Sequence, residues 1–217
     1  MRQLVLELAP PEPPSFASYV PGRNAAALAA LRSALAGGER FVYLWGPSGS
    51  GKTHLLRAFE TAGGRAADDV QRLDEPGQIA LFDLYNALRA SGGALAAAGD
   101  EPPEGLRLRE DLRSRLGSGV VIQLRPLSET EKAAALRERA KARGIALSDG
   151  VIAYLLTHLR RDMGTQIAVL DALDRHSLER QRPITVPLLK QALRSLEQEK
   201  KGRRLPPDIA GPRKGGP

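Results

Sequence analysis

The pattern of hydrophobic and polar positions changes once along the chain, near residue 126. Before that point, three short apolar runs, at 40–45, 93–99 and 120–124, alternate with stretches whose apolar residues recur at helical spacing. Short apolar runs bounded by glycine or turn residues are typical of buried strands, and strands that alternate with helices form parallel sheets. We therefore predict an α/β layer structure for this part, with Asn24 capping its first helix. The predicted helices cover 25–36, 55–61, 79–88 and 106–116.

After residue 126 only helical patterns remain. Ser128 and Glu131 have the spacing of a capping box, and we expect the helix that they open to close at Gly144. Ser148 and Thr185 are the predicted caps of two later helices. The chain is thus expected to have four segments: an extended N-terminal segment at 1–22, an α/β domain at 23–125, a small all-helical domain at 126–198 and a basic disordered tail at 199–217.

The positive charge of the chain is concentrated at its end. The formal net charge is +7, and the tail at 199–217, with six basic and two acidic residues, supplies +4 of it. Such a tail is expected to be a solvated end, with non-specific contact to DNA as the alternative. The absence of cysteine removes disulfides and thiol chemistry. No apolar run approaches the ~18–20 residues of a membrane span, so we expect a cytoplasmic protein with no membrane contact.

The strongest local signal is a complete P-loop pattern, Gly-x-x-x-x-Gly-Lys-Thr, between a predicted strand and a predicted helix. Its glycines let backbone N–H groups close around phosphate oxygens, and the helix N-terminus adds a favourable field. Lys52 is expected to neutralise the β- and γ-phosphates, and the Thr53 hydroxyl to bind Mg²⁺. The expected cofactor-binding residues of this segment are Gly46, Pro47, Ser48, Gly49, Ser50, Gly51, Lys52, Thr53 and His54.

A nucleotide hydrolase also needs a carboxylate that holds Mg²⁺ and a group that polarises water. Asp68 and Asp69 form the first acidic pair after the P-loop helix, so they are the candidate catalytic carboxylates. Asp68 would join Thr53 as a metal ligand. The alternative is that this pair is a solvated loop.

Several segments, taken in order over residues 1–196, resemble the DnaA family of AAA+ proteins. The resemblance implies an α/β fold of the AAA+ kind, in which helices flank a P-loop parallel sheet and a small all-helical lid domain follows. It also implies ADP or ATP as ligand, with Mg²⁺. The matching segments are the lead-in at 16–24, the Walker A motif at 46–54, the Walker B end at 68–71, a helix at 79–86, the sensor 1 turn at 98–103, the arginine-finger segment at 111–119, the start of the lid at 126–132 and the sensor 2 segment at 161–163.

The same resemblance implies roles for residues that have no strong local signal. Tyr19 and Val20 would flank the adenine base, Asp100 would lie beside the phosphates, and Arg161 would contact the nucleotide from the lid. Arg115 would act in trans, as an arginine finger that stabilises charge on the ATP of another molecule. Simple packing, a turn aspartate and solvated surface arginines remain the alternatives.

The N-terminal residues favour a regulatory member of the family over an initiator. Gln3, Leu4, Leu6 and Leu8 lie in a segment that resembles the peptide with which such regulators dock on the DNA polymerase sliding clamp. An edge strand is the alternative for this leucine alternation. The chain ends at residue 217, and we expect no helix-turn-helix domain after the lid. The expected partners are the clamp, the DnaA initiator and, through the clamp, DNA; a homo-oligomer is left open.

One interval departs from the family pattern. Fifteen residues separate Lys52 from Asp68, where the family usually has another strand, another helix and the apolar Walker B strand. Here only 65–67 precede the aspartates, so we expect an edge strand to be missing and the Walker B strand to be reduced. Because phosphoryl chemistry depends on positioning, we expect nucleotide binding to survive better than hydrolysis. In the finger segment, Ser118 stands where related regulators have an aromatic residue.

These observations favour an adenine-nucleotide-binding regulator at the replisome that docks on the clamp and stimulates hydrolysis of ATP bound to DnaA. Replication initiation would thereby be switched off. One alternative is a self-contained AAA+ ATPase of the clamp-loader or helicase-loader kind, which brisk intrinsic hydrolysis would favour. A second is a nucleotide-binding scaffold that stimulates nothing.

Overall fold

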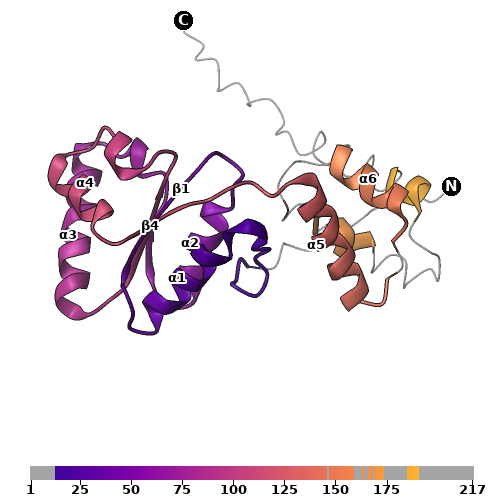
Figure 1. Ribbon diagram of the computed structural model, residues 1–217, viewed down its shortest axis with the longest axis horizontal. Helices are drawn as coiled ribbons and strands as arrows, with labels where there is room; N and C mark the ends of the chain where they lie inside the picture. The colour runs from indigo at the N-terminus through magenta and orange to yellow at the C-terminus, as the bar shows by residue number, and fades with distance from the viewer. Residues whose placement is uncertain are drawn as a thin grey trace, which may run out of the picture.

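The computed structural model describes residues 13–145, 147–158, 163, 166–167, 169–173 and 185–190. These residues form an α/β body followed by a group of helices (Figure 1). None of the helices in these ranges is long and apolar enough to cross a membrane. The elements are η1 (Gly22–Asn24), α1 (Ala25–Leu35), β1 (Phe41–Trp45), α2 (Lys52–Thr61), β2 (Arg65–Ala67), η2 (Val70–Arg72), α3 (Glu75–Ser91), β3 (Leu95–Gly99), η3 (Pro103–Gly105), α4 (Glu110–Gly117), β4 (Val120–Gln123), α5 (Glu129–Ala142) and α6 (Asp149–His158).

The four strands form one parallel sheet in the order β2-β3-β1-β4. The two central strands pair along their whole length, from Phe41 opposite Leu95 to Trp45 opposite Gly99. Every residue of β3 is buried, and most are alanine or glycine, so helices can approach the sheet closely there. The predicted fold class, a parallel sheet with flanking helices, is confirmed.

Helices cover both faces of the sheet (Figure 1). On one face, α1 and α2 bury Leu31 and Phe59 against β1 and β3. On the other, α3 and α4 bury Tyr85 and Leu112 against the same strands. Trp45, the last residue of β1, is half-buried against this second layer. The P-loop therefore starts from a strand that is held on both sides.

The strand that precedes the acidic pair is short. β2 has three residues, none fully buried, and among the described strands it lies at the edge, paired with β3. The chain reaches it from α2 through Gly63 and Gly64, and a Cβ at Gly64 would overlap the ring of Phe59. This tight connection leaves no room for a further strand and helix between α2 and β2. The prediction of a reduced Walker B strand is confirmed.

The predicted role of Asn24 as a helix cap is wrong. Its side chain makes no capping hydrogen bond to α1 and is buried instead. The amide Nδ2 donates to the Arg125 carbonyl at 2.8 Å, and Oδ1 accepts from the Arg125 N–H at 2.9 Å. Asn24 thus satisfies the backbone of the segment that leaves β4, which a capping interaction would leave unpaired.

Two helices differ in detail from their predicted patterns. α3 begins at Glu75 rather than at 79; Ile79 is 40% exposed, and the buried side chains of the helix are Leu81 and Tyr85. α4 begins at Glu110 rather than at 106, since η3 and an extended stretch come first. Leu106 is still buried below this stretch.

The helical group has the predicted caps. Ser128 and Glu131 form a capping box, in which the Ser128 Oγ accepts from the Glu131 N–H and the Glu131 carboxylate accepts from the Ser128 N–H. These bonds hold the pKa of Glu131 below its usual range. The Ser148 Oγ accepts from the Val151 N–H at 3.4 Å. The side chains buried between these helices include Leu136, Val151, Leu155, Leu170, Leu173 and Leu189.

Asn24→Ala is predicted to lower the free energy of unfolding by about 1–3 kcal/mol, because two backbone groups of Arg125 lose their partner. Urea denaturation followed by circular dichroism measures this difference. Asp83→Ala, on the exposed side of α3, is the control and should change stability by less than about 0.5 kcal/mol. Equal effects of the two substitutions would show that the Asn24 bonds do not hold the segment after β4.

Candidate functional site

The P-loop connects β1 to α2 through three glycines with positive φ: Gly46 at 154°, Gly49 at 79° and Gly51 at 97°. A Cβ at Gly46 would overlap the carbonyl of Leu124, and one at Gly51 would press on the ring of Tyr19. Glycine is therefore required here for both backbone conformation and space. The first N–H groups of α2 have no partners within the helix. The loop places them where they can donate hydrogen bonds to a ligand.

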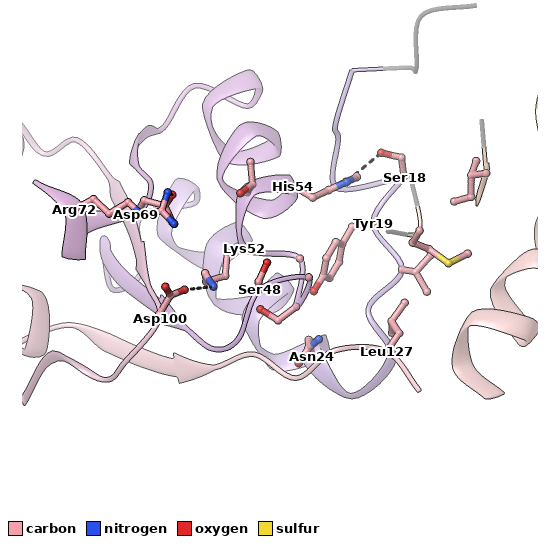
Figure 2. A pocket seen from close by; sticks show the side chains of 17 residues that line it. Ser18, Tyr19, Asn24, Ser48, Lys52, His54, Asp69, Arg72, Asp100 and Leu127 are labelled. Carbon is pink, nitrogen blue, oxygen red and sulfur yellow. Dashed lines mark hydrogen bonds and ion pairs between the residues drawn. The ribbon is translucent and has the colours of Figure 1, made fainter. Parts of the chain in front are cut away.

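A cavity of about 440 Å³ lies against this loop (Figure 2). Its walls come from the lead-in segment, the P-loop, the ends of β2 and β3, and the residues Leu127, Met163 and Ile167 further along the chain. The volume falls in the range of ~300–1,000 Å³ that is usual for small-molecule sites. The predicted cofactor-binding residues that line it are Tyr19, Val20, Ser48, Gly49, Ser50, Gly51, Lys52, Thr53, His54 and Asp100.

The ammonium group of Lys52 is buried at the base of the cavity. It donates to Asp100 Oδ1 at 3.0 Å, to the Pro47 carbonyl at 3.3 Å and to the Gly46 carbonyl. Gly46 and Pro47 thus act through their carbonyls and are not among the residues that line the cavity. The side chain of Lys52 is 8% exposed, so it needs a nearby negative charge, and Asp100 supplies it (Figure 2).

Thr53 and Asp68 lie together, as the predicted metal site requires. The Thr53 hydroxyl donates to Asp68 Oδ2 at 2.6 Å, and both residues are exposed. A hydroxyl and a carboxylate are ligand types that Mg²⁺ takes, usually with water and substrate phosphates completing its shell. Within the described ranges no three His, Cys, Asp or Glu side chains converge on one point. The pair therefore fits a Mg²⁺ ion that is shared with phosphates, and it does not fit a closed protein cage.

Gln71 connects two of the predicted carboxylates and was not singled out from the sequence. Its Nε2 donates to Asp69 Oδ1 at 3.3 Å and to Asp100 Oδ2 at 3.0 Å. Asp69 also pairs with Arg72 at 3.2 Å and has φ of 49°, a conformation that is uncommon for an aspartate. The signal was present in the sequence, since an amide side chain follows the acidic pair at a distance of two residues.

An aromatic wall forms the side of the cavity opposite the carboxylates (Figure 2). The rings of Tyr19 and His54 lie 5.5 Å apart. His54 Nε2 is 3.1 Å from the Ser15 carbonyl and 3.4 Å from the Ser18 hydroxyl, so it ties the lead-in to α2. Burial raises the pKa of Tyr19, and the side chain of Asn24 opposes this rise by a smaller amount. A flat ligand fits this wall, since it can stack on Tyr19.

Tyr43 supports the turn that carries Asp100, and it too was missed. Its hydroxyl donates to the Glu101 carbonyl at 2.9 Å and lies where a Cβ at Gly99 would be. Burial and the neighbouring carboxylates of Asp100 and Glu101 raise the pKa of Tyr43, which stays protonated and able to donate. Sequence reasoning placed Tyr43 in a strand, and its contact with residue 101 is long-range.

Arg115 lies apart from the cavity. It stands in the last turn of α4 and lines a small recess with Phe41 and Tyr85. Phe41 is the first residue of β1, whereas the P-loop follows the last one, so the length of the strand separates Arg115 from Lys52. The structure thus brings the predicted nucleotide residues together and leaves Arg115 at the opposite end of the sheet.

Five predicted site residues lie outside the described part of the chain. They are the partner-binding residues Gln3, Leu4, Leu6 and Leu8 and the lid residue Arg161. Met163 and Ile167, which follow Arg161 in sequence, line the cavity.

The sheet order, the P-loop and the helical group that follows define a DnaA-like AAA+ fold. Domain III of DnaA from Thermotoga maritima has a TM-score of 0.63 and 22% identity over 88% of this chain and 98% of that chain. AMPPCP-bound DnaA from Aquifex aeolicus has a TM-score of 0.60 and 23% identity over 79% and 69%. A RuvB variant from Thermotoga maritima has a TM-score of 0.56 and 17% identity over 88% and 73%. At these identities the likeness establishes the fold.

Residues 129–193 match the family described as the lid domain of Hda. The match begins at the first residue of α5, so the helical group that starts there resembles an Hda lid. Together with the DnaA fold of the body, this match confirms the resemblance to Hda, a homologue of DnaA.

Lys52→Ala is predicted to weaken binding of ADP and of ATP with Mg²⁺ at least tenfold, because the phosphates lose a buried cation. Calorimetric titration of the purified chain measures both affinities. Lys141→Ala, which removes an exposed ammonium from α5, is the control and should bind like the unaltered chain. If the unaltered chain bound neither nucleotide, the short interval between Lys52 and Asp68 would have broken the site.

Proposed function

We propose that the chain is an adenine-nucleotide-binding AAA+ regulator that docks on the DNA polymerase sliding clamp and stimulates hydrolysis of ATP bound to the initiator DnaA. The observation that carries the proposal is that the predicted functional residues lie at two opposite ends of the sheet. The phosphate-binding groups gather at the carboxyl end of the sheet, and the candidate finger, Arg115, stands at the amino end. An arginine in that place serves a second molecule and not its own ligand.

The cavity supports binding of the chain's own nucleotide. Lys52 and Arg72 supply positive charge on the phosphate side, and Tyr19 and Val20 form the side for the base. Two of the DnaA structures that share this fold were determined with AMPPCP, an ATP analogue. A nucleotide that touches both the P-loop and the lid residues Met163 and Ile167 would fix the lid against the body.

Hydrolysis of this nucleotide by the chain itself is expected to be slow. Asp68 is exposed and follows a three-residue edge strand, so few contacts hold it in position. Asp69 is engaged by Gln71 and Arg72. Phosphoryl transfer depends on precise positioning and on stabilisation of charge, and Arg115 is too distant to help in cis. A nucleotide that persists would act as a structural ligand.

The placement of Arg115 suits action in trans. A five-residue strand spans ~13 Å from first to last residue, and Arg115 lies at the far end of β1 from the P-loop. The recess that Arg115 lines is formed by residues of β1, β3, α3 and α4. A partner's ATP that approached this end of the sheet would meet a half-buried arginine.

Docking on the clamp would bring the two proteins together. The residues assigned to it, Gln3, Leu4, Leu6 and Leu8, resemble a clamp-binding peptide and lie outside the described residues. Tethering raises the effective concentration of one protein near the other without any new contact between them. Contact with DNA would be indirect, through the clamp, and the protein would act in the cytoplasm at the replisome.

A self-contained ATPase of the clamp-loader or helicase-loader kind is the second candidate. The observation in its favour is that Thr53 and Asp68, the pair needed for Mg²⁺, are in contact. Turnover of ATP by the isolated chain separates the two functions. A rate of about 1 s⁻¹ or more, near the lower end of ordinary enzyme turnover, would favour the second candidate.

Arg115→Ala is predicted to keep nucleotide and clamp binding but to lose stimulation of the initiator's ATPase, since an arginine finger contributes ~10³–10⁵ in rate. The measurement is hydrolysis of DnaA-bound ATP in the presence of clamp loaded on DNA. Arg89→Ala, an exposed arginine in the last turn of α3, is the control and should stimulate normally. Stimulation that survives Arg115→Ala would refute the finger assignment.

Deletion of residues 1–8 is predicted to abolish clamp binding while nucleotide affinity stays unchanged, because the P-loop cavity is built from residues 18 onward. Surface plasmon resonance on immobilised clamp measures the first property, and calorimetry the second. Stimulation of the initiator's ATPase should then fall at low concentration and recover when the concentration of the deleted chain is raised. Unchanged clamp binding would refute the docking assignment.

A further inference from the structure

The aromatic ring of Tyr85 lies under the guanidinium group of Arg115. The distance from the guanidinium carbon to the ring centroid is 5.7 Å, within the range of a cation–π contact. Tyr85 is buried in α3, and its ring is packed against Phe41 with 4.1 Å between centroids. Since Phe41 belongs to a central strand, the ring that carries the guanidinium is anchored to the sheet.

The hydroxyl of Tyr85 holds the main chain of the same arginine. Its Oη is 3.1 Å from the Ser118 Oγ, and the Ser118 hydroxyl donates to the Arg115 carbonyl at 2.8 Å. A serine hydroxyl has one proton, which is used in the bond to Arg115, so the tyrosine is the donor to Ser118. One side chain therefore contacts Arg115 twice, through the ring at the guanidinium and through Ser118 at the backbone.

We propose that Tyr85 is a positioning residue that holds Arg115 ready for delivery to a phosphate group of a partner-bound nucleotide. This inference rests on the proposed function of Arg115 as a finger in trans. An arginine has many rotamers, and the entropy lost on fixing one of them opposes its action. A ring that already restricts the guanidinium removes part of that loss before the partner arrives.

Two substitutions separate the contribution of the Tyr85 ring from that of its hydroxyl. Tyr85→Phe keeps the ring and loses the bond to Ser118, and Tyr85→Leu loses both. We expect Tyr85→Leu to lower the maximal stimulated rate of hydrolysis about fivefold, in the range of a partly exposed cation–π contact. Tyr85→Phe should restore most of this rate. The concentration for half-maximal stimulation and the affinity for ADP should stay unchanged in both.

Double substitution with Arg115→Ala distinguishes positioning from simple packing. If Tyr85 acts through Arg115, then Tyr85→Leu has no further effect on stimulation once Arg115 is alanine. Additive losses in the double variant, or a Tyr85→Leu rate equal to that of the unaltered chain, would overturn the inference and leave the finger assignment intact. Stimulation that persists in Arg115→Ala alone would overturn the proposed function and this inference together.

A measurement on the unaltered full-length chain does not depend on whether Tyr85→Leu folds. The side-chain protons of Arg115, assigned by comparison with Arg115→Ala, should show an upfield ring-current shift in nuclear magnetic resonance spectra. The shift should remain in Tyr85→Phe. Chemical shifts of a freely rotating arginine in the unaltered chain would refute the contact itself.

Discussion

The parallel pairing of the strands decides where the P-loop and the carboxylates of the cavity lie. Because the strands run the same way, their carboxyl ends meet at one edge of the sheet, and each end carries a polar residue there. β1 leads into the P-loop, β3 into Asp100 and β2 into Asp68. A slip of one residue between β1 and β3 would turn Tyr43 to the other face and remove the support of the Asp100 turn.

The charges at that edge are linked in one chain of contacts. Lys52 bonds Asp100, Gln71 bridges Asp100 to Asp69, and Arg72 pairs with Asp69. Lys52 is buried, so its charge is tolerated only with a partner, and a phosphate and a carboxylate compete for the same three ammonium protons. Ligand binding at the P-loop is therefore connected to the segments that follow β3 and β2.

Much of this arrangement could be predicted from the sequence because its signals are local. The P-loop is a contiguous pattern with a defined context, and Ser128 and Glu131 form the expected capping box within four residues. What could not be predicted depends on contacts between distant segments. Asn24 looked like a cap by its position, but it bonds Arg125, 101 residues further on.

The same limit applied to the residues that support the site. Gln71 follows the acidic pair in the sequence, but its bond to Asp100 depends on the pairing of β2 with β3. Tyr43 contacts Glu101, which lies 58 residues further on. The distance of Arg115 from the P-loop follows from topology, since α4 ends just before β4 begins and hence at the amino end of the sheet. That conclusion needs the strand directions, which single residues do not reveal.

The tryptophan at the end of β1 gives the protein a fluorescence signal beside the P-loop. Trp45 is the single tryptophan of the chain, it is half-buried, and it immediately precedes Gly46. All indole fluorescence of the protein therefore originates one residue from the P-loop. The chain carries its own optical reporter at the point where a rearrangement of that loop would change the local surroundings.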